Sequence, residues 1–420
     1  MKYWITLASA LLFASSALAE KSAQGSSIRL NQVIEKVLQH NPQIRAGDIE
    51  AQAAFTRVLQ KNQTSPLFFN IEVENFAGGD SFAGSNSLET TLSFARVLEL
   101  GGKPVLRGNV ARQQALLLQN NNDAKKLDLL AEATRRFIDI LVDQHRLDIA
   151  QNRMALIEKK QTIVAKRVRL GKSPRSESRR IKIELERAKI GTDDIKHELK
   201  ASRLQLSSLW GELEPAFNNV QASLFELDTP VDFSELQALL QRNPDLAQFA
   251  TQERLAAARV SLARSRRKQD IEISGGIRHH NASSDLALVL SASIPFGTTT
   301  RAKPYEDEAQ LLSQVTPFDL EQQRNALYAS LFALNEELKH SHEAVELLRD
   351  VIIPEADQVL RDYQRGYEAG RYSLLELNDV QTTLLEVQSE AVVEASKYHR
   401  NKIEIERLTG MHMSRAEERK

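Results

Sequence analysis

The sequence has no cysteine in its 420 residues. It can therefore form no disulfide, no thiolate metal site, no cysteine nucleophile and no lipoprotein-type lipid anchor. Aromatic residues make up only 6% of the chain, and the formal net charge is −1. A near-neutral chain lacks the basic stripe of nucleic-acid-binding proteins, so we expect no nucleic acid as a partner.

Long apolar runs are also missing beyond the N-terminus. Lys2, the apolar stretch from Ile5 to Ala17 and the Ala17-Leu18-Ala19 triplet form a secretory signal, which predicts removal of residues 1–19. The run is shorter than the ~20 residues that a membrane-spanning helix needs. An exported chain of this kind can be periplasmic, secreted or a transmembrane β-barrel, whose alternating pattern hydropathy misses.

Motifs for catalysis are missing too. The chain has no Ser/His/Asp arrangement, no P-loop and no GxGxxG pattern, and the histidine pairs His279-His280 and His340/His342 lack a third ligand at a suitable spacing. We therefore expect neither an enzyme nor a protein with a cofactor or a tight metal site.

Alternation with period two dominates residues 66–99. Apolar and polar residues alternate from Leu67 to Glu74, a loop rich in Gly, Ser and Asn covers 78–87, and a second alternating stretch runs from Leu88 to Leu98. Each stretch has room for the ~9–11 residues with which a tilted strand crosses a bilayer. A lone hairpin is only marginally stable in water, so this one must pair with other strands.

Helix-forming residues without a break follow from about Leu106 to Leu170. A tight turn at 171–174 leads to a second helix, Arg175 to about Trp210. Its apolar residues recur at alternating steps of three and four, which predicts an antiparallel coiled coil between the two helices. The residues of this seam are Ile181, Leu185, Ala188, Thr192, Ile195, Leu199, Ser202, Leu206 and Leu209.

The chain then repeats itself. Asn243-Pro244 echoes Asn41-Pro42, and Leu408-Thr409-Gly410 echoes Leu209-Trp210-Gly211. A second hairpin is predicted over 270–296 with its loop at Gly275–Ser284. A second long helical stretch, from about Tyr305 to Ala369 with bends at Pro317 and Pro354, turns at 370–373 and returns along a seam of its own.

Two structural repeats therefore follow the signal peptide. The first covers 20–232, with a β-hairpin at 66–99, a long helical hairpin at 104–210 and an irregular connector at 211–232. The second covers 233–410, with a β-hairpin at 270–296 and a long helical hairpin at 301–410. Residues 411–420 form a charged tail. We read residues 28–62 as one amphipathic helix punctuated at Asn41-Pro42.

Four strands are too few to close a barrel, which takes about eight or more. Lipid-facing strands cannot leave an edge unpaired, so several chains would have to share one barrel. Its wet interior would be lined by Asn70, Glu72, Glu74 and Glu272, together with Glu89 and Asp285. The alternative is a soluble hairpin that packs on helices and alternates because it is half buried.

This layout resembles the TolC-type outer-membrane efflux family over essentially all of the mature chain. The resemblance is carried by the paired Asn-Pro steps, the strand exit 98–107, Ser293-Ile294-Pro295-Phe296, the segment from Gly366 to Gln381 and the closing Leu-x-Gly pair. The Glu99-Leu100-Gly101-Gly102-Lys103 segment is most similar to the heavy-metal (cobalt–zinc–cadmium) branch. The resemblance implies a mainly α fold with transmembrane β-strands: a homotrimer with a twelve-stranded barrel and a periplasmic α-helical coiled-coil tunnel.

The function implied is that of an exit duct in the outer membrane of a Gram-negative bacterium. It would pass metal cations, or drugs, from an inner-membrane pump of the resistance-nodulation-division type through a periplasmic adaptor. Three alternatives remain open: the outer-membrane component of type I protein secretion, a periplasmic coiled-coil adaptor, and a secreted structural coiled coil. The second lacks the β-rich flanking domains that adaptors carry.

In the family, charged and tyrosine side chains close the far end of the tunnel. Carried over, that end is the two helical turns here, and the implied gate residues are Glu177, Tyr367, Arg371, Glu376 and Asp379. The place of the family's basic partner, two residues after Gly370, holds Tyr372, with Arg371 one residue earlier. The implied adaptor contacts are Arg167, Val168, Leu170, Gly171, Gly366 and Gly370. Acidic side chains around an axis repel one another and attract cations.

Overall fold

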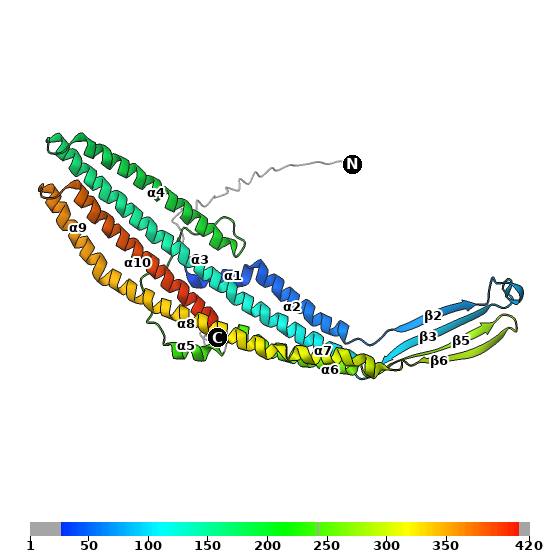
Figure 1. Ribbon diagram of the computed structural model, residues 1–420. Coiled ribbons are helices and arrows are strands. Elements are labelled where there is room, and N and C mark those ends of the chain that lie inside the picture. Colours follow the sequence, from blue (N-terminus) through cyan, green and yellow to red (C-terminus); the bar gives the residue numbers. More distant parts are fainter. Residues whose placement is uncertain (1–26, 242, 411–420) are drawn as a thin grey trace, which may run out of the picture.

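The molecule is long and narrow, with a β-sheet at one end and two helical hairpins extending away from it (Figure 1). The structure is a computed structural model that describes residues 27–241 and 243–410. The predicted signal peptide, 1–19, and the tail, 411–420, lie outside the described residues. Within them, no helix combines the length and the apolar character needed to cross a membrane.

The longest element is α3 (Lys103–Arg169), an uninterrupted helix of 67 residues that extends for about 100 Å at the usual rise per residue. It packs along α4 (Arg175–Ser208). The predicted seam of α4 is confirmed, because Ile181, Leu185, Thr192, Leu199 and Leu206 are all buried. Burial of one apolar stripe along two helices is what stabilises a hairpin of this length.

The second helical hairpin is more irregular. Its outgoing arm consists of α7 (Thr298–Ser313), α8 (Val315–Leu347), a π-helical segment (Leu348–Ile352) and α9 (Ile353–Glu368), and its return arm is α10 (Leu374–Thr409). The first break is at Gln314, so Pro317 lies in the first turn of α8, where proline is tolerated. The bend predicted at Pro354 agrees better with the structure, because the π-helical segment ends at Ile352, two residues before Pro354. That proline cannot donate the next helical hydrogen bond.

The N-terminal helix is broken, contrary to the single helix that we read over 28–62. Strand β1 (Ser27–Ile28) precedes α1 (Leu30–His40), and α2 (Pro42–Lys61) begins directly after Asn41. β1 pairs in parallel with β4 (Asn219–Val220), which lies in the stretch predicted to be irregular. Ile28 and Val220 join a core cluster that also contains residues of α1, α3, α4 and α10.

The two Asn-Pro steps and the two Leu-x-Gly steps turn out to be bonded to each other. Asn41 caps α2 by accepting hydrogen bonds from the next backbone amides, and its Nδ2 donates to the Leu209 carbonyl at 2.8 Å. Asn243 does the same for α6 (Pro244–Ser265), and its Nδ2 donates to the Leu408 carbonyl at 2.7 Å. Both asparagines are buried. Each ties the start of one helix to the end of a long return helix.

Replacing Asn243 with Ala should destabilise the protein by about 2–4 kcal/mol, because it removes a helix cap and leaves the Leu408 carbonyl unpaired in the interior. Thermal unfolding followed by circular dichroism in detergent would measure the loss. Asn152→Ala, on an exposed position of α3, is the matched control and should leave the midpoint unchanged. Equal midpoints for the two variants would contradict this role of Asn243.

A second buried contact makes the stability depend on pH. The Tyr398 hydroxyl donates to the Asp228 carbonyl at 2.6 Å, and burial raises the pKa of Tyr398 from 10.0 to about 12. The unfolded tyrosine ionises near pH 10 while the folded one stays neutral. This stabilisation is therefore complete below pH 10 and is lost as the pH rises towards 12. It amounts to about 2–3 kcal/mol.

We expect the unfolding midpoint of the wild type to fall more steeply between pH 10 and 12 than that of Tyr398→Phe. Tyr305→Phe, which changes a tyrosine that is 52% exposed, should keep the wild-type slope. Parallel curves for wild type and Tyr398→Phe would show that Tyr398 is not the group responsible.

The β-sheet has four antiparallel strands in the order β2-β3-β5-β6. The strands are β2 (Leu67–Glu74), β3 (Glu89–Glu99), β5 (Asp270–His280) and β6 (Asp285–Ser293), and a 3₁₀ turn (Asp80–Phe82) lies in the first loop. The two predicted hairpins are thus neighbours in one sheet, joined by β3 and β5. Among the described residues, β2 and β6 are edge strands without an outer partner.

The loop predicted at 275–284 is much shorter than expected. Strand β5 runs on to His280, so Gly275 and Gly276 lie within the strand and only 281–284 form the turn. A Cβ at Gly276 would lie 2.2 Å from the Leu92 carbonyl oxygen. Glycine is required there because β3 and β5 approach too closely for a side chain, and not because the chain turns.

The two faces of the sheet differ sharply. In the observed register Glu72, Thr91 and Arg278 lie side by side on one face, whereas Ile71, Leu92 and Ile277 lie on the other. The second face is apolar and bare, with Leu288 at 83% and Leu290 at 85% exposure. A bare apolar face on a sheet with two free edges is a contact surface and not a typical water-exposed one.

Candidate functional site at the hairpin tips

The turns of both helical hairpins lie together at the end of the molecule opposite the sheet (Figure 1). Both turns use the same cap. Lys172 N–H donates to the Arg167 carbonyl, and Arg371 N–H donates to the Gly366 carbonyl, in the pattern of a Schellman motif. Gly171 and Gly370 adopt positive φ angles of 68° and 80°, which glycine accepts without strain.

Arg167, near the end of α3, joins the two tips. Its Nη1 donates to the backbone carbonyl of Tyr367 on α9 at 2.6 Å, and its Nε donates to Ser173 Oγ at 3.1 Å. Its guanidinium also lies 4.6 Å from the centre of the Tyr367 ring. One arginine therefore ties the first turn to the second by a charge-assisted hydrogen bond and a cation–π contact.

Tyr367 is buried at 2% exposure, in a core cluster shared by α3, α4, α9 and α10. Burial raises the pKa of its hydroxyl; the Glu177 carboxylate raises the pKa further, and Arg167 lowers it. The Tyr367 hydroxyl and Glu177 Oε2 are buried, and neither forms a hydrogen bond of normal geometry with another described residue. The polar interior of the tip is thus held mainly by Arg167.

The acidic residues of α10 behave differently from one another. Glu376 Oε2 accepts hydrogen bonds from the Ser373 backbone amide and hydroxyl, both at 2.8 Å, in a capping box. The bond from the backbone amide holds the pKa of Glu376 below its usual value. Asp379 is exposed, and its side chain has no partner among the described residues. Both carboxyl groups lie near the second turn.

Arg371, the base expected at the gate, is exposed and its side chain makes no hydrogen bond or ion pair with the described residues. Arg167, expected at the partner surface, is the arginine that contacts Tyr367. At the next position, the Tyr372 ring stacks on Tyr363 with 4.3 Å between ring centres. A Cβ on Gly366 would lie 2.2 Å from the Tyr372 ring, so this tyrosine fills the space beside α9.

The remaining residues expected at the partner surface are mixed in their exposure. Leu170 is 60% exposed, and Gly171 and Gly370 are also exposed. Val168 is half buried and Gly366 is buried beneath Tyr372. An exposed leucine at a helix end is a feature that a partner helix can use.

The four residues predicted to line a channel all lie on the polar face of the sheet. Asn70, Glu72 and Glu74 follow one another along β2, and Glu272 lies on β5. Sequence reasoning missed the base among them: Arg278 is paired with Glu74 at 3.0 Å and with Glu89 at 3.1 Å. This ion-pair network crosses three strands, so the polar face carries charges of both signs.

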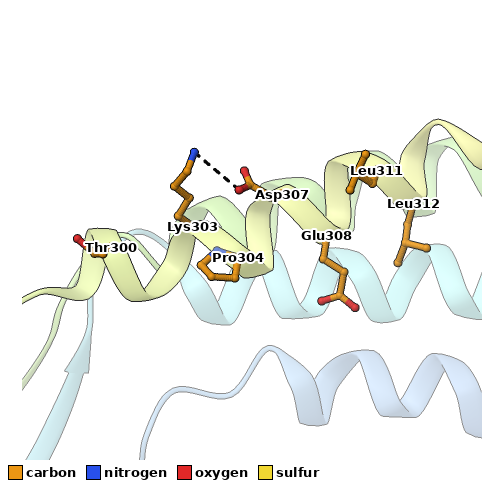
Figure 2. Close-up of a pocket in the computed structure, with 7 residues that line it drawn as sticks. All are labelled: Thr300, Lys303, Pro304, Asp307, Glu308, Leu311 and Leu312. Atoms are coloured by element: carbon orange, nitrogen blue, oxygen red, sulfur yellow. Dashed lines mark ion pairs between the residues drawn. The ribbon is translucent and has the colours of Figure 1, made fainter.

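Another bare surface lies on α7, outside the residues picked from the sequence. A shallow hollow of about 630 Å³ is lined by Thr300, Lys303, Pro304, Asp307, Glu308, Leu311 and Leu312 (Figure 2). Leu311 and Leu312 are 65% and 57% exposed. The described residues contain no group of three or more His, Asp or Glu side chains that could hold a metal ion. With its two exposed leucines, the hollow is a candidate contact surface.

Long helical hairpins that end in an amphipathic sheet define a channel-type fold, and the comparisons agree. Residues 236–411 match the outer membrane efflux protein family. This part of the chain is similar to the outer membrane efflux domain, in agreement with the resemblance that the motifs carry. The cobalt-zinc-cadmium resistance protein CzcC of Cupriavidus metallidurans is 25% identical over 296 residues, 69% of this chain and 70% of CzcC.

Solved structures share the fold at low sequence identity. CusC, described in connection with transmembrane channel formation, superposes with a TM-score of 0.76 at 16% identity and covers 92% of both chains. The outer membrane protein VceC of Vibrio cholerae gives 0.74 at 15% identity, covering 91% of this chain and 96% of VceC. The outer membrane channel MtrE of Neisseria gonorrhoeae, solved in its open state, gives 0.71 at 16% identity, covering 91% and 89%.

Proposed function

We propose that this protein is the outer-membrane exit duct of a tripartite efflux system. The observation that carries the proposal is the four-stranded sheet with a bare apolar face and two free edges, placed at the end of very long helical hairpins. Lipid would cover the apolar face of such a sheet, and further strands would pair with the free backbone groups at its edges. The polar face then lines a water-filled lumen.

Three copies of the four-stranded sheet would form one twelve-stranded barrel, with β2 of each copy beside β6 of the next. The strand count is within the range of outer-membrane barrels, which starts at about 8 strands. The bare face of α7 supports the same homotrimer, because Leu311 and Leu312 need a neighbouring chain to cover them. In the trimer the helical hairpins would form a tunnel into the periplasm.

The division into two repeats, 20–232 and 233–410, also belongs to this proposal. Its support is the equivalence of the two buried asparagines, each of which binds the end of its own long return helix. The same connection made twice gives each repeat one β-hairpin and one helical hairpin. A wall built from two similar units per chain suits a tunnel of three chains.

The gate would lie at the tips. Glu177, Tyr367, Glu376 and Asp379 lie near the two turns, with Arg167 joining the turns and Arg371 exposed beside them. Copies of Glu376 and Asp379 around a three-fold axis would repel one another and concentrate cations. Leu170, Gly171 and Gly370 would meet the helical hairpins of a periplasmic adaptor, which connects the duct to an inner-membrane pump. No chemistry is needed for this role, so the protein is not an enzyme.

Metal cations are the substrate class that we propose. The similarity to the cobalt-zinc-cadmium resistance protein CzcC supports this choice. The pump and the adaptor select the substrate, and the duct supplies a cation-attracting passage.

Removal of the acidic charges tests the gate directly. The double variant Glu376→Gln with Asp379→Asn should lose most of its preference for K⁺ over Cl⁻ in planar bilayers, because the charges that attract cations are gone. Glutamine at 376 keeps the oxygen that accepts from Ser373. Glu368→Gln with Glu390→Gln, both exposed on α9 and α10, is the control with equal charge loss. Unchanged selectivity in the acidic-pair variant would remove these residues from the gate.

A further inference from the structure

Lys160 is a lysine buried between the two helical hairpins. It lies on α3, between the seam residues Ile157 and Val164, and its side chain is only 3% exposed. Its Nζ has three acceptors: Glu184 Oε1 at 2.9 Å, Asn378 Oδ1 at 2.6 Å and Gln381 Oε1 at 3.0 Å. A lysine ammonium has three protons to donate, so every one is matched.

The acceptors come from both helical hairpins. Glu184 belongs to α4, the partner of α3 in the first hairpin, whereas Asn378 and Gln381 belong to α10 in the second. Burial lowers the pKa of Lys160, and the charge of Glu184 opposes that effect. An apolar residue would hold α3 to α4 at lower electrostatic cost, so stability alone does not explain a cation here.

Its contacts with α10 fix how that helix is rotated. Asn378 and Gln381 are three residues apart and lie on one face of α10. At about 100° per residue, Glu376 and Asp379 lie on the opposite side of the helix, and both are exposed. The hydrogen bonds of Asn378 and Gln381 to Lys160 therefore keep the carboxylates of Glu376 and Asp379 on the side of α10 that faces away from α3.

We infer that Lys160 is a positioning residue of the gate, which sets the direction in which α10 presents Glu376 and Asp379. The inference rests on the proposed function, because it assigns these carboxylates to a passage. The cation draws both amides inward, and the first hairpin then holds the second in its closed position. Arg167 ties the turns themselves, seven positions further along α3, or about 10 Å along the helix. The two helical hairpins are thus held together by Arg167 at the turns and by Lys160 between the helices.

Two variants separate positioning from stability. Lys160→Met removes the cation but leaves the half-buried Glu184 without its partner. Lys160→Met with Glu184→Met removes the whole ion pair, which restores an apolar seam between α3 and α4 and is often neutral for stability. Neither variant can hold Asn378 and Gln381. Both should therefore open the tips, even where the double variant melts at the wild-type temperature.

Conductance in planar bilayers gives the first readout. We expect both variants to conduct about threefold or more above wild type at equal salt, since a wider constriction carries more ions. Lys182→Met, which removes an exposed lysine from α4, should behave as wild type. Wild-type conductance in the Lys160→Met/Glu184→Met variant would overturn the inference, while the proposed function would stand.

The distance between the hairpins gives a readout that does not need a channel. The chain has no cysteine, so spin labels can be placed at Lys182→Cys on α4 and Thr382→Cys on α10 in full-length protein diluted with unlabelled copies. The double Met variant should shift the distance distribution by several ångströms and broaden it. An unchanged distance distribution would overturn the inference about Lys160. Wild-type protein that forms no channel would instead refute the proposed function. The distance measurement does not depend on channel activity, so the two failures can be told apart.

Discussion

Leu288→Arg should abolish the outer-membrane form of the protein. Leu288 lies near the middle of the edge strand β6, on the apolar face, and is 83% exposed in the single chain. In lipid, an arginine at the middle of a barrel strand costs about 2–4 kcal/mol, and each trimer would contain three of them. We expect trimers to disappear from the outer-membrane fraction and monomers to be degraded or to accumulate in the periplasm.

The control for this variant lies three residues away. Ser291 is on the polar face of the same strand, opposite Ser274, and is also exposed. Ser291→Arg adds the same side chain to the lumen side and should leave the trimer intact. On a soluble sheet both arginines would simply face water and both variants would fold. Normal amounts of Leu288→Arg trimer in the outer-membrane fraction would therefore contradict the lipid-facing assignment.

Arg167→Gln should open the tips. The change removes the cation that bonds the Tyr367 carbonyl and covers its ring, and it loosens the contact with Ser173. A charge-assisted hydrogen bond in a buried position contributes about 1.5–3 kcal/mol, so its loss shifts a closed–open equilibrium by more than tenfold. We expect a severalfold rise in bilayer conductance and greater sensitivity of the cells to large antibiotics that the outer membrane excludes.

Arg169→Gln is the matched control. It removes the same charge from the same helix two positions away, where the side chain is exposed and has no partner among the described residues. It should leave both conductance and antibiotic sensitivity unchanged. If the two glutamine variants gave the same rise, the effect would come from net charge at the tips and not from the tie between the two turns.

The pattern of the sequence was enough for the elements that repeat one simple rule. The seam of α4 follows a heptad, so its buried positions were predicted residue by residue. Strand β2 alternates clearly and β3 loosely, and the predicted division into an apolar and a polar face agrees with the observed register. In both cases the apolar residues recur with the spacing at which the helix or the strand places side chains on one face.

Features that depend on contacts between distant segments were not predictable. Gly275 and Gly276 are typical of a turn, and only the nearness of Leu92 on β3 reveals that Gly276 is needed inside a strand. The contact between Arg167 and Tyr367 joins residues 200 positions apart, so no local pattern around either turn could have indicated it.

Lys160 did carry a signal that could have been read. It follows Ile157 by three positions and precedes Val164 by four, so it occupies a seam position where an apolar residue is expected. A charged residue in a seam indicates a buried partner. The partners themselves, Asn378 and Gln381, could not be foreseen, because amides on a helix surface are usually solvated.

The most direct test of the account joins the edges of the sheet. In the cysteine-free chain, Asn70→Cys on β2 is combined with a cysteine at each polar-face position of β6 in turn: Asp285, Ala287, Val289, Ser291 or Ser293. If three chains share one barrel, oxidised outer membranes will contain a covalent trimer for one or two neighbouring positions and for none of the single-cysteine variants. Monomers alone across the whole series, with correctly folded protein, would contradict the shared barrel and with it the exit duct.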